Sequence, residues 1–238
     1  MTCREANVDK PPGVLVDQFG RHHVDLRVSV TDRCNLRCTY CMPLDATFMR
    51  QEKLLTFDEV TRCVSVAAEM GVRTIRLTGG EPLMRPNVHR LIQQLTRLPR
   101  IEEVALTTNG LLLTDQAAGL AEAGLSRLNV SLDSLDEGRF ETISRRSGLQ
   151  RILEGLEEAG RQGFRSIRIN AVSIRGLTEQ EIVPLAMFCR EHRFHLRFIE
   201  FMPLDAEDAW SRQHVLTGLE VRRILEMHIG QHLSLIHI

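Results

Sequence analysis

Residues 25–41 read DLRVSVTDRCNLRCTYC, which is a short strand pattern followed at once by three cysteines. Polar and apolar side chains alternate through residues 25–31, as they do in a β-strand with one face packed on a core. Cys34, Cys38 and Cys41 follow in a CxxxCxxC arrangement. A [4Fe-4S] cluster needs four ligands, so three cysteine ligands would leave one iron free to bind another molecule.

Short strand patterns alternate with longer helical patterns along the chain. Strands are expected at residues 25–31, 74–78, 104–107, 127–132, 166–172 and 195–201. Helices are expected at residues 56–70, 87–97, 114–123, 150–162, 178–192 and 217–227. Two of these helices begin with the residues of a capping box, Thr56 with Glu59 and Thr178 with Glu181.

This alternation predicts an α/β fold in which parallel strands are joined by right-handed crossovers. Six strand–helix units fit an incomplete (β/α)6 TIM-like barrel, and an open doubly wound sheet is the alternative that spacing alone does not exclude. In both folds the reactive residues lie at the C-terminal ends of the strands. The three-cysteine loop begins at that edge.

The composition is that of an ordinary globular protein. The chain has 238 residues, a formal net charge of -1 and a hydrophobic fraction of 43%. Neither a nucleic-acid nor a membrane partner is indicated, and no apolar run suits a signal or a membrane span, so a cytoplasmic protein is expected. We expect a disordered tail at residues 1–13, a core domain at 14–228 and an unrelated or truncated tail at 229–238.

The cysteines and the Gly-Gly-Glu-Pro run after the second expected strand also have simpler interpretations. A structural zinc site remains open for the cysteine loop, although the chain shows no second CxxC pair. Cys63 and Cys189 are expected in the core, and Cys3 is expected to be inert. The Gly-Gly-Glu-Pro run at residues 79–82 could bind a small amphoteric molecule, with Glu81 accepting from its ammonium group, or could be a plain tight turn.

The CxxxCxxC loop and the Gly-Gly-Glu-Pro run, in this order, together resemble the radical S-adenosylmethionine superfamily. Within it, further motifs resemble the family of GTP 3′,8-cyclases, which act in molybdenum cofactor (molybdopterin) biosynthesis. These motifs are DLRVSVTDRC at 25–34, LTGGEPLMR at 77–85, LTTNG at 106–110, NVSLD at 129–133 and RFIEFM at 197–202. The resemblance covers about residues 15–225.

The resemblance implies two cofactors in one site. A [4Fe-4S] cluster would be bound by Cys34, Cys38 and Cys41, and its fourth iron by the amine and carboxylate of S-adenosylmethionine. One electron from the cluster would then break the sulfonium bond and leave a 5′-deoxyadenosyl radical. The positions that match the family's contacts to S-adenosylmethionine are Tyr40, Gly80, Ser131 and Met202.

The substrate that the resemblance implies is GTP. Its matching contacts are Arg27, Arg76, Thr107 and Arg168, the last standing where the family usually has lysine. Hydrogen removal from the ribose 3′ carbon and attack on guanine C8 would give 3′,8-cyclo-7,8-dihydro-GTP. The implied partners are a flavodoxin- or ferredoxin-like electron donor and a companion cyclic pyranopterin monophosphate synthase, and a homodimer is possible.

The C-terminal part of the sequence departs from the family. The family carries a second cysteine trio there, which holds a second [4Fe-4S] cluster, whereas no cysteine follows Cys189 in this chain. We therefore expect a truncated cyclase that binds the first cluster and S-adenosylmethionine without completing the cyclisation. The alternatives are a radical enzyme that acts on a peptide, which Arg27 and Arg76 argue against, and a non-catalytic metal-binding module.

Overall fold

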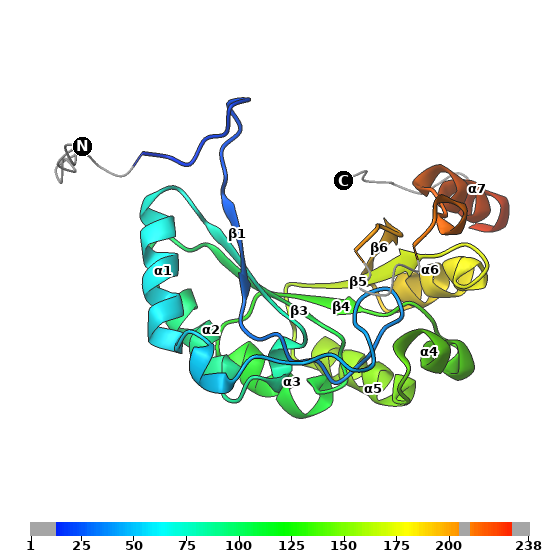
Figure 1. Ribbon diagram of the computed structural model, residues 1–238, viewed down its shortest axis with the longest axis horizontal. Helices are drawn as coiled ribbons and strands as arrows, with labels where there is room; N and C mark the ends of the chain where they lie inside the picture. Colours follow the sequence, from blue (N-terminus) through cyan, green and yellow to red (C-terminus); the bar gives the residue numbers. More distant parts are fainter. Residues whose placement is uncertain (1–12, 205–209, 230–238) are drawn as a thin grey trace.

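The computed structural model describes residues 13–204 and 210–229, which form one curved six-stranded sheet with helices along its outer side (Figure 1). The strands are β1 Asp25–Ser29, β2 Thr74–Thr78, β3 Glu103–Thr108, β4 Arg127–Ser131, β5 Ser166–Ser173 and β6 His195–Glu200. Each strand pairs in parallel with the next one along the chain. The sequential order β1 to β6 confirms the incomplete barrel and excludes the doubly wound alternative, whose strand order reverses.

Helices connect the strands and follow the last one. Their bounds are α1 Phe57–Glu69, α2 Val88–Thr96, α3 Leu113–Glu122, α4 Glu137–Ser144, α5 Leu149–Arg161, α6 Ile182–Glu191 and α7 Gly218–Ile229. Single 3₁₀ turns lie at Gln51–Lys53, Pro82–Met84, Glu179–Glu181 and Arg212–His214. All six expected helices are present, and α4 is additional. The sequence of α4 offers few large apolar residues, and the helix begins where the Asp136 carboxylate accepts from the Arg139 amide at 2.8 Å.

One of the two capping boxes expected from the sequence forms, and the other does not. Thr56 and Glu59 form the expected capping box at the start of α1. The expectation for Thr178 is wrong, because its hydroxyl accepts from the Ile174 amide at 2.7 Å instead of capping a helix. The Glu181 carboxylate is likewise engaged elsewhere, accepting from Leu135 N at 2.7 Å, so α6 begins later than predicted.

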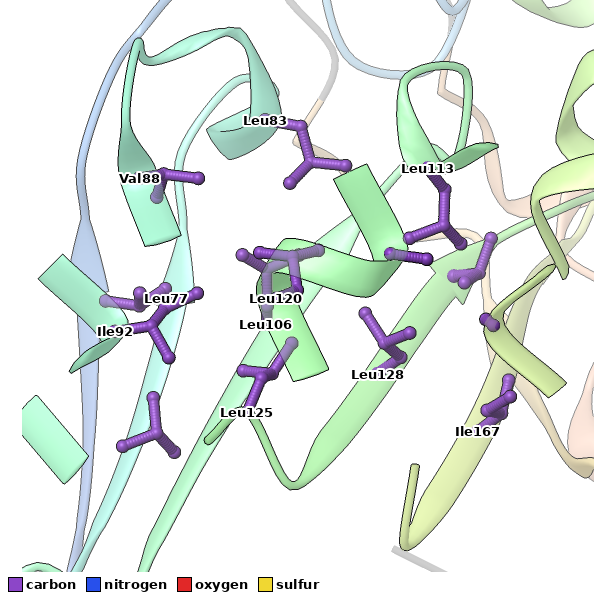
Figure 2. Close-up of a cluster of buried hydrophobic side chains, with 14 of the residues drawn as sticks. Leu77, Leu83, Val88, Ile92, Leu106, Leu113, Leu120, Leu125, Leu128 and Ile167 are labelled. Atoms are coloured by element: carbon purple, nitrogen blue, oxygen red, sulfur yellow. The ribbon is translucent and has the colours of Figure 1, made fainter. Parts of the chain in front are cut away.

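The hydrophobic core lies between the sheet and the helices. Figure 2 shows strand residues such as Leu77, Leu106 and Leu128 turned toward helix residues such as Ile92 and Leu120. All five side chains are at most 1% exposed. The polar residues that alternate with the buried strand residues must therefore lie on the opposite, inner face of the sheet.

The two cysteines expected in the core differ. Cys189 is buried as expected. Cys63 is exposed, so that expectation is wrong: α1 buries Val60, Val64 and Ala68, and residue 63 falls beside this stripe. Cys3, most of the expected tail at 1–13 and residues 230–238 lie outside the described residues. Across 13–204 and 210–229, the structure contains no helix with the length and apolar character to cross a membrane.

The position of the core predicts that two leucine-to-alanine substitutions have different effects on stability. Leu106→Ala removes a fully buried side chain, and we expect it to lower the free energy of unfolding by about 3 kcal/mol. Leu219→Ala, at a position 64% exposed, should change it by less than about 0.5 kcal/mol. Urea unfolding followed by circular dichroism gives both values. Equal losses in the two variants would contradict the assigned core.

Candidate functional site

The cysteine loop crosses the C-terminal edge of the sheet and is tied down at both of its sides. Directly after β1, the Val30 amide donates to the Thr78 carbonyl at 2.9 Å. Further along, the amides of Arg37 and Thr39 donate to the carbonyls of Ser144 and Ile143, each at 2.9 Å. The loop is thus held between the end of β2 and the end of α4, a helix that the sequence analysis did not predict.

Two glycines after β2 allow the backbones of two loops to touch. A Cβ atom on Gly79 would lie 2.2 Å from the carbonyl oxygen of Thr31, and one on Gly80 would lie 2.4 Å from that of Arg33. The contact is closed by hydrogen bonds from Gly80 N to Thr31 O at 2.8 Å and from Glu81 N to Arg33 O at 2.7 Å. The glycines are therefore required for loop docking, whether or not a ligand is bound.

The oxygens of the Glu81 carboxylate, which the sequence left open as acceptors for a ligand ammonium, are occupied by hydrogen bonds within the protein. The residue is 1% exposed, and Oε1 accepts from Leu83 N at 3.0 Å and from Thr108 Oγ1 at 2.7 Å. Oε2 accepts from Asn109 N at 2.6 Å. Burial raises the pKa of Glu81, and these hydrogen bonds oppose that shift. The carboxylate joins the ends of β2 and β3 and has no free face for a ligand ammonium.

The three expected metal ligands line one cavity of about 380 Å³ at this edge. The other lining residues include Ser29, Thr31, Thr78, Gly79 and Gly80. Burial raises the pKa of Cys38 to about 12 and raises that of Cys34 as well, so both thiols hold their protons at neutral pH. A thiol must lose its proton to bind a metal, and metal binding here would therefore release protons.

Tyr40 points from the cysteine loop toward the ends of β4 and β5. Its hydroxyl donates to Asp133 Oδ2 at 2.6 Å, and the other oxygen of Asp133 accepts from Val172 N at 2.7 Å. A second, small cavity of about 30 Å³ lies here, lined among others by Cys38, Tyr40, Asn109, Ser131 and Asp133. The aromatic ring is thus fixed against two strands by a buried carboxylate.

The inner face of the sheet carries five arginines, which we call the inner arginine layer: Arg27, Arg76, Arg127, Arg168 and Arg197. Arg27 and Arg76 are direct partners across β1 and β2. Burial lowers the pKa of Arg76, and the positive charges of Arg27, Arg127 and Arg197 add to that shift. Mutual repulsion of this kind marks a surface that is prepared to receive an anion.

Little in the described part of the chain neutralises this layer. Of the five arginines, only Arg127 forms an ion pair there, with Glu103 at 2.5 Å. The Nε atoms of Arg76 and Arg127 are buried and have no hydrogen-bond partner among the described residues. Buried cationic donors without partners are costly unless a ligand supplies the acceptors.

Two of these arginines were missed by the sequence analysis. Arg127 and Arg197 belong to the inner face with the expected Arg27, Arg76 and Arg168. A signal was present for Arg197, which lies between Leu196 and Phe198 just as Arg27 and Arg76 lie between apolar residues. Arg127 follows Ser126 at the start of β4, so only Leu128 marks it as part of an alternation.

The other expected binding residues, Thr107, Ser131 and Met202, lie at three separate positions. Thr107 is on the inner face of β3, where Asn129 Nδ2 lies 3.5 Å from its hydroxyl. Ser131 ends β4 at the second cavity. Met202 follows β6, is 49% exposed and is absent from the lining of both cavities. Contact between Met202 and a cofactor therefore stays a prediction.

The residues present fit the metal cluster and the cofactor that the sequence implies. Three thiols face one cavity, and its wall includes the glycine backbone and two hydroxyl side chains of β1 and β2. Within the described residues, no three His, Cys, Asp or Glu side chains are already gathered tightly enough to hold a metal ion. The fit therefore rests on the three thiol groups as metal ligands and on the volume of the cavity that they line.

The family comparison agrees with this arrangement of fold and site. The model of the radical SAM superfamily matches residues 28–189, from within β1 to within α6. The chain belongs to the radical SAM superfamily. Membership implies S-adenosylmethionine and a [4Fe-4S] cluster as the cofactors of the site.

Curated relatives make the comparison more specific. A GTP 3′,8-cyclase of Rhodopirellula baltica is 50% identical over 221 residues, which cover 92% of this chain and 62% of the relative. A GTP 3′,8-cyclase of Corynebacterium glutamicum is 46% identical over 219 residues, 90% of this chain and 58% of the relative. Molybdenum cofactor biosynthesis protein 1 of Drosophila melanogaster is 41% identical, over 93% of this chain and 39% of the relative. The chain spans about three fifths of the length of the bacterial cyclases it matches.

Solved structures share the fold at low sequence identity. Streptococcus suis SuiB bound to S-adenosylmethionine has a TM-score of 0.69 and 20% identity, covering 86% of this chain and 46% of that one. Methylornithine synthase has a TM-score of 0.66 and 16% identity, covering 85% of this chain and 61% of that one. At these identities the likeness shows the fold alone.

Docking of the two loops predicts opposite effects for two glycine substitutions. Gly80→Ala forces a methyl group against the backbone of residue 33, and we expect a loss of about 1–3 kcal/mol in unfolding free energy. Gly119→Ala in α3 meets open space and should raise stability by about 0.5–1 kcal/mol. Urea unfolding measures both changes. Unchanged stability of Gly80→Ala would contradict the close approach of the loops.

Proposed function

We propose that this chain is the barrel part of a GTP 3′,8-cyclase, which binds a [4Fe-4S] cluster, S-adenosylmethionine and GTP on the inner side of its sheet. One observation carries the proposal: a cavity lined by three thiols lies at the C-terminal edge of the sheet that carries the inner arginine layer. The likeness to GTP 3′,8-cyclases over nine tenths of this chain supports GTP as the substrate.

The cluster would be held by Cys34, Cys38 and Cys41, and S-adenosylmethionine would lie beside it along the glycine loop. When bound, these cofactors would supply one-electron cleavage of a sulfonium bond and, from it, hydrogen-atom abstraction from the substrate. The protein's part is to hold the thiolates, to orient the cofactor and to limit the access of water. The hydrogen bonds that tie the cysteine loop to β2 and α4 serve the first of these tasks.

The proposed contacts to S-adenosylmethionine are Tyr40, Gly80, Ser131 and Met202. Tyr40 is supported best, because Asp133 holds its hydroxyl and so fixes its orientation. Gly80 lines the same cavity as the three thiols, and the absence of a side chain lets its backbone lie against residues 32–33 at that wall. Ser131 stands at the end of β4, where a parallel sheet presents its reactive groups.

GTP would lie along the inner face with its triphosphate on the arginines. Arg27, Arg76 and Arg168 can form paired hydrogen bonds with phosphate oxygens, and Thr107 can donate one more. Arg168 in place of the family's usual lysine keeps the charge and adds a fork geometry. Arg76 precedes the last residue of β2 by two positions, or about 7 Å of strand. A bound nucleotide could thus reach from the arginines to the thiol cavity.

The proposed reaction has requirements outside this chain. The cluster must be reduced, which calls for a one-electron donor of the flavodoxin or ferredoxin type. The cyclised nucleotide would be the substrate of a cyclic pyranopterin monophosphate synthase. A second [4Fe-4S] cluster has no cysteine ligands between residues 190 and 238 of this sequence.

Loss of one thiol tests the cluster assignment. After anaerobic reconstitution the chain should bind about four irons and release 5′-deoxyadenosine from S-adenosylmethionine when dithionite is added. Cys38→Ala should lose most of the iron and all of this release, whereas Cys63→Ala, at an exposed site on α1, should keep both. Iron analysis and chromatography provide the readouts. Release by Cys38→Ala equal to that of the unmodified chain would reject the assignment.

Loss of one arginine tests the nucleotide site. Arg76→Ala removes a charged donor that faces the phosphates, so GTP affinity should fall about tenfold or more while S-adenosylmethionine affinity is kept. Arg90→Ala, which removes an exposed arginine of α2, should change neither affinity. Calorimetry on the reconstituted chain measures both ligands. Unchanged GTP affinity in Arg76→Ala would refute the proposed phosphate site.

A further inference from the structure

Asn109 places a side-chain amide next to one of the three cysteines. It follows β3 directly, and its Nδ2 donates to Cys34 Sγ at 3.8 Å and to Asn35 Oδ1 at 2.7 Å. The backbone amide of Leu36 also donates to Cys34 Sγ, at 3.5 Å. Cys34 therefore accepts from two N–H groups, one from its own loop and one from a loop 75 residues further along the chain.

The orientation of the Asn109 amide is set by its other contacts. Its Oδ1 accepts from Leu111 N at 3.1 Å, so the oxygen end is used by a backbone donor and the NH₂ end must face the sulfur. Its own backbone amide donates to Glu81 Oε2 at 2.6 Å. The residue is 9% exposed. The donor is therefore held in place before any cofactor binds.

The contact at the Cys34 sulfur joins two loops, and a third loop is connected to it through Asn109. Cys34 lies on the loop after β1, Glu81 on the loop after β2 and Asn109 on the loop after β3. Because the buried Glu81 carboxylate anchors the backbone of Asn109, the position of the donor is tied to the docking of the glycine loop.

We propose that Asn109 tunes the cluster: its side-chain N–H hydrogen-bonds to the Cys34 sulfur and raises the reduction potential. This inference rests on the proposed function, in which Cys34 binds iron. An N–H donor withdraws electron density from a ligating sulfur and so favours the reduced, more negatively charged cluster. Asn109 is a positioning residue in this sense, because it acts through Cys34.

A variant with a short polar side chain at position 109 separates an effect on the reduction potential from an effect on folding. Asn109→Ser keeps a hydroxyl that can accept from Leu111 N, but it is too short to reach Cys34. Asn87→Gly is the control: Asn87 is exposed and has a φ of 60°, which glycine adopts without strain. The reconstituted chains are titrated anaerobically, and the reduced cluster is followed by electron paramagnetic resonance.

We expect the midpoint potential of Asn109→Ser to shift to more negative values and that of Asn87→Gly to equal the unmodified chain. A potential unchanged in Asn109→Ser, with the cluster assembled, would overturn the inference and leave the cluster assignment standing. Failure of the unmodified chain to assemble a cluster would overturn the assignment of Cys34 and the inference with it.

A second measurement decides the matter if Asn109→Ser does not hold a cluster. The unmodified chain, carrying ¹⁵N in its asparagine side chains, is studied by pulsed electron paramagnetic resonance of the reduced cluster. A nitrogen coupling that is lost in a variant of Asn109 with an assembled cluster supports the inference, and a coupling that persists in such a variant would overturn it. The absence of any such coupling in the unmodified chain would overturn the inference.

Discussion

The contact between the backbone of residues 31–33 and the two glycines after β2 is the constraint on which the rest of the site depends. Gly79 and Gly80 leave no room for a side chain, and hydrogen bonds from Gly80 N to Thr31 O and from Glu81 N to Arg33 O join the two strand ends into one wall. Hydrogen bonds between backbones cannot be replaced by side-chain rearrangement when the strands themselves are fixed in register. The thiol cavity, the Glu81 network and the orientation of Asn109 all follow from this wall.

The two faces of the sheet have different roles. The outer face is apolar and packs on the helices, which holds the strands in their order. The inner face carries arginines whose charges repel one another, and Arg127 alone among the five has an ion-pair partner in the described ranges. Such a face costs stability in the absence of a ligand, and this is the usual relation between a binding site and the core that supports it.

Much of the fold was predictable because alternation and capping are local properties of a sequence. Six strands and six of the helices follow from the spacing of apolar side chains along the chain. Where the prediction failed, tertiary contacts overrode the local pattern. Thr178 makes hydrogen bonds within its own turn, and Glu181 pairs with Arg139 of α4, a helix whose sequence carries a weak apolar pattern.

The sequence by itself indicated the class of chemistry through the resemblance that the cysteine loop and the Gly-Gly-Glu-Pro run carry together, because short motifs are local patterns. Only the tertiary structure decided which groups meet. It placed the Glu81 carboxylate on the backbone amide of Asn109, the Asn109 side-chain amide on Cys34 and the Tyr40 hydroxyl on Asp133. The partners in these contacts are between 28 and 93 residues apart in the chain, and such pairings follow from strand register, which no local pattern encodes.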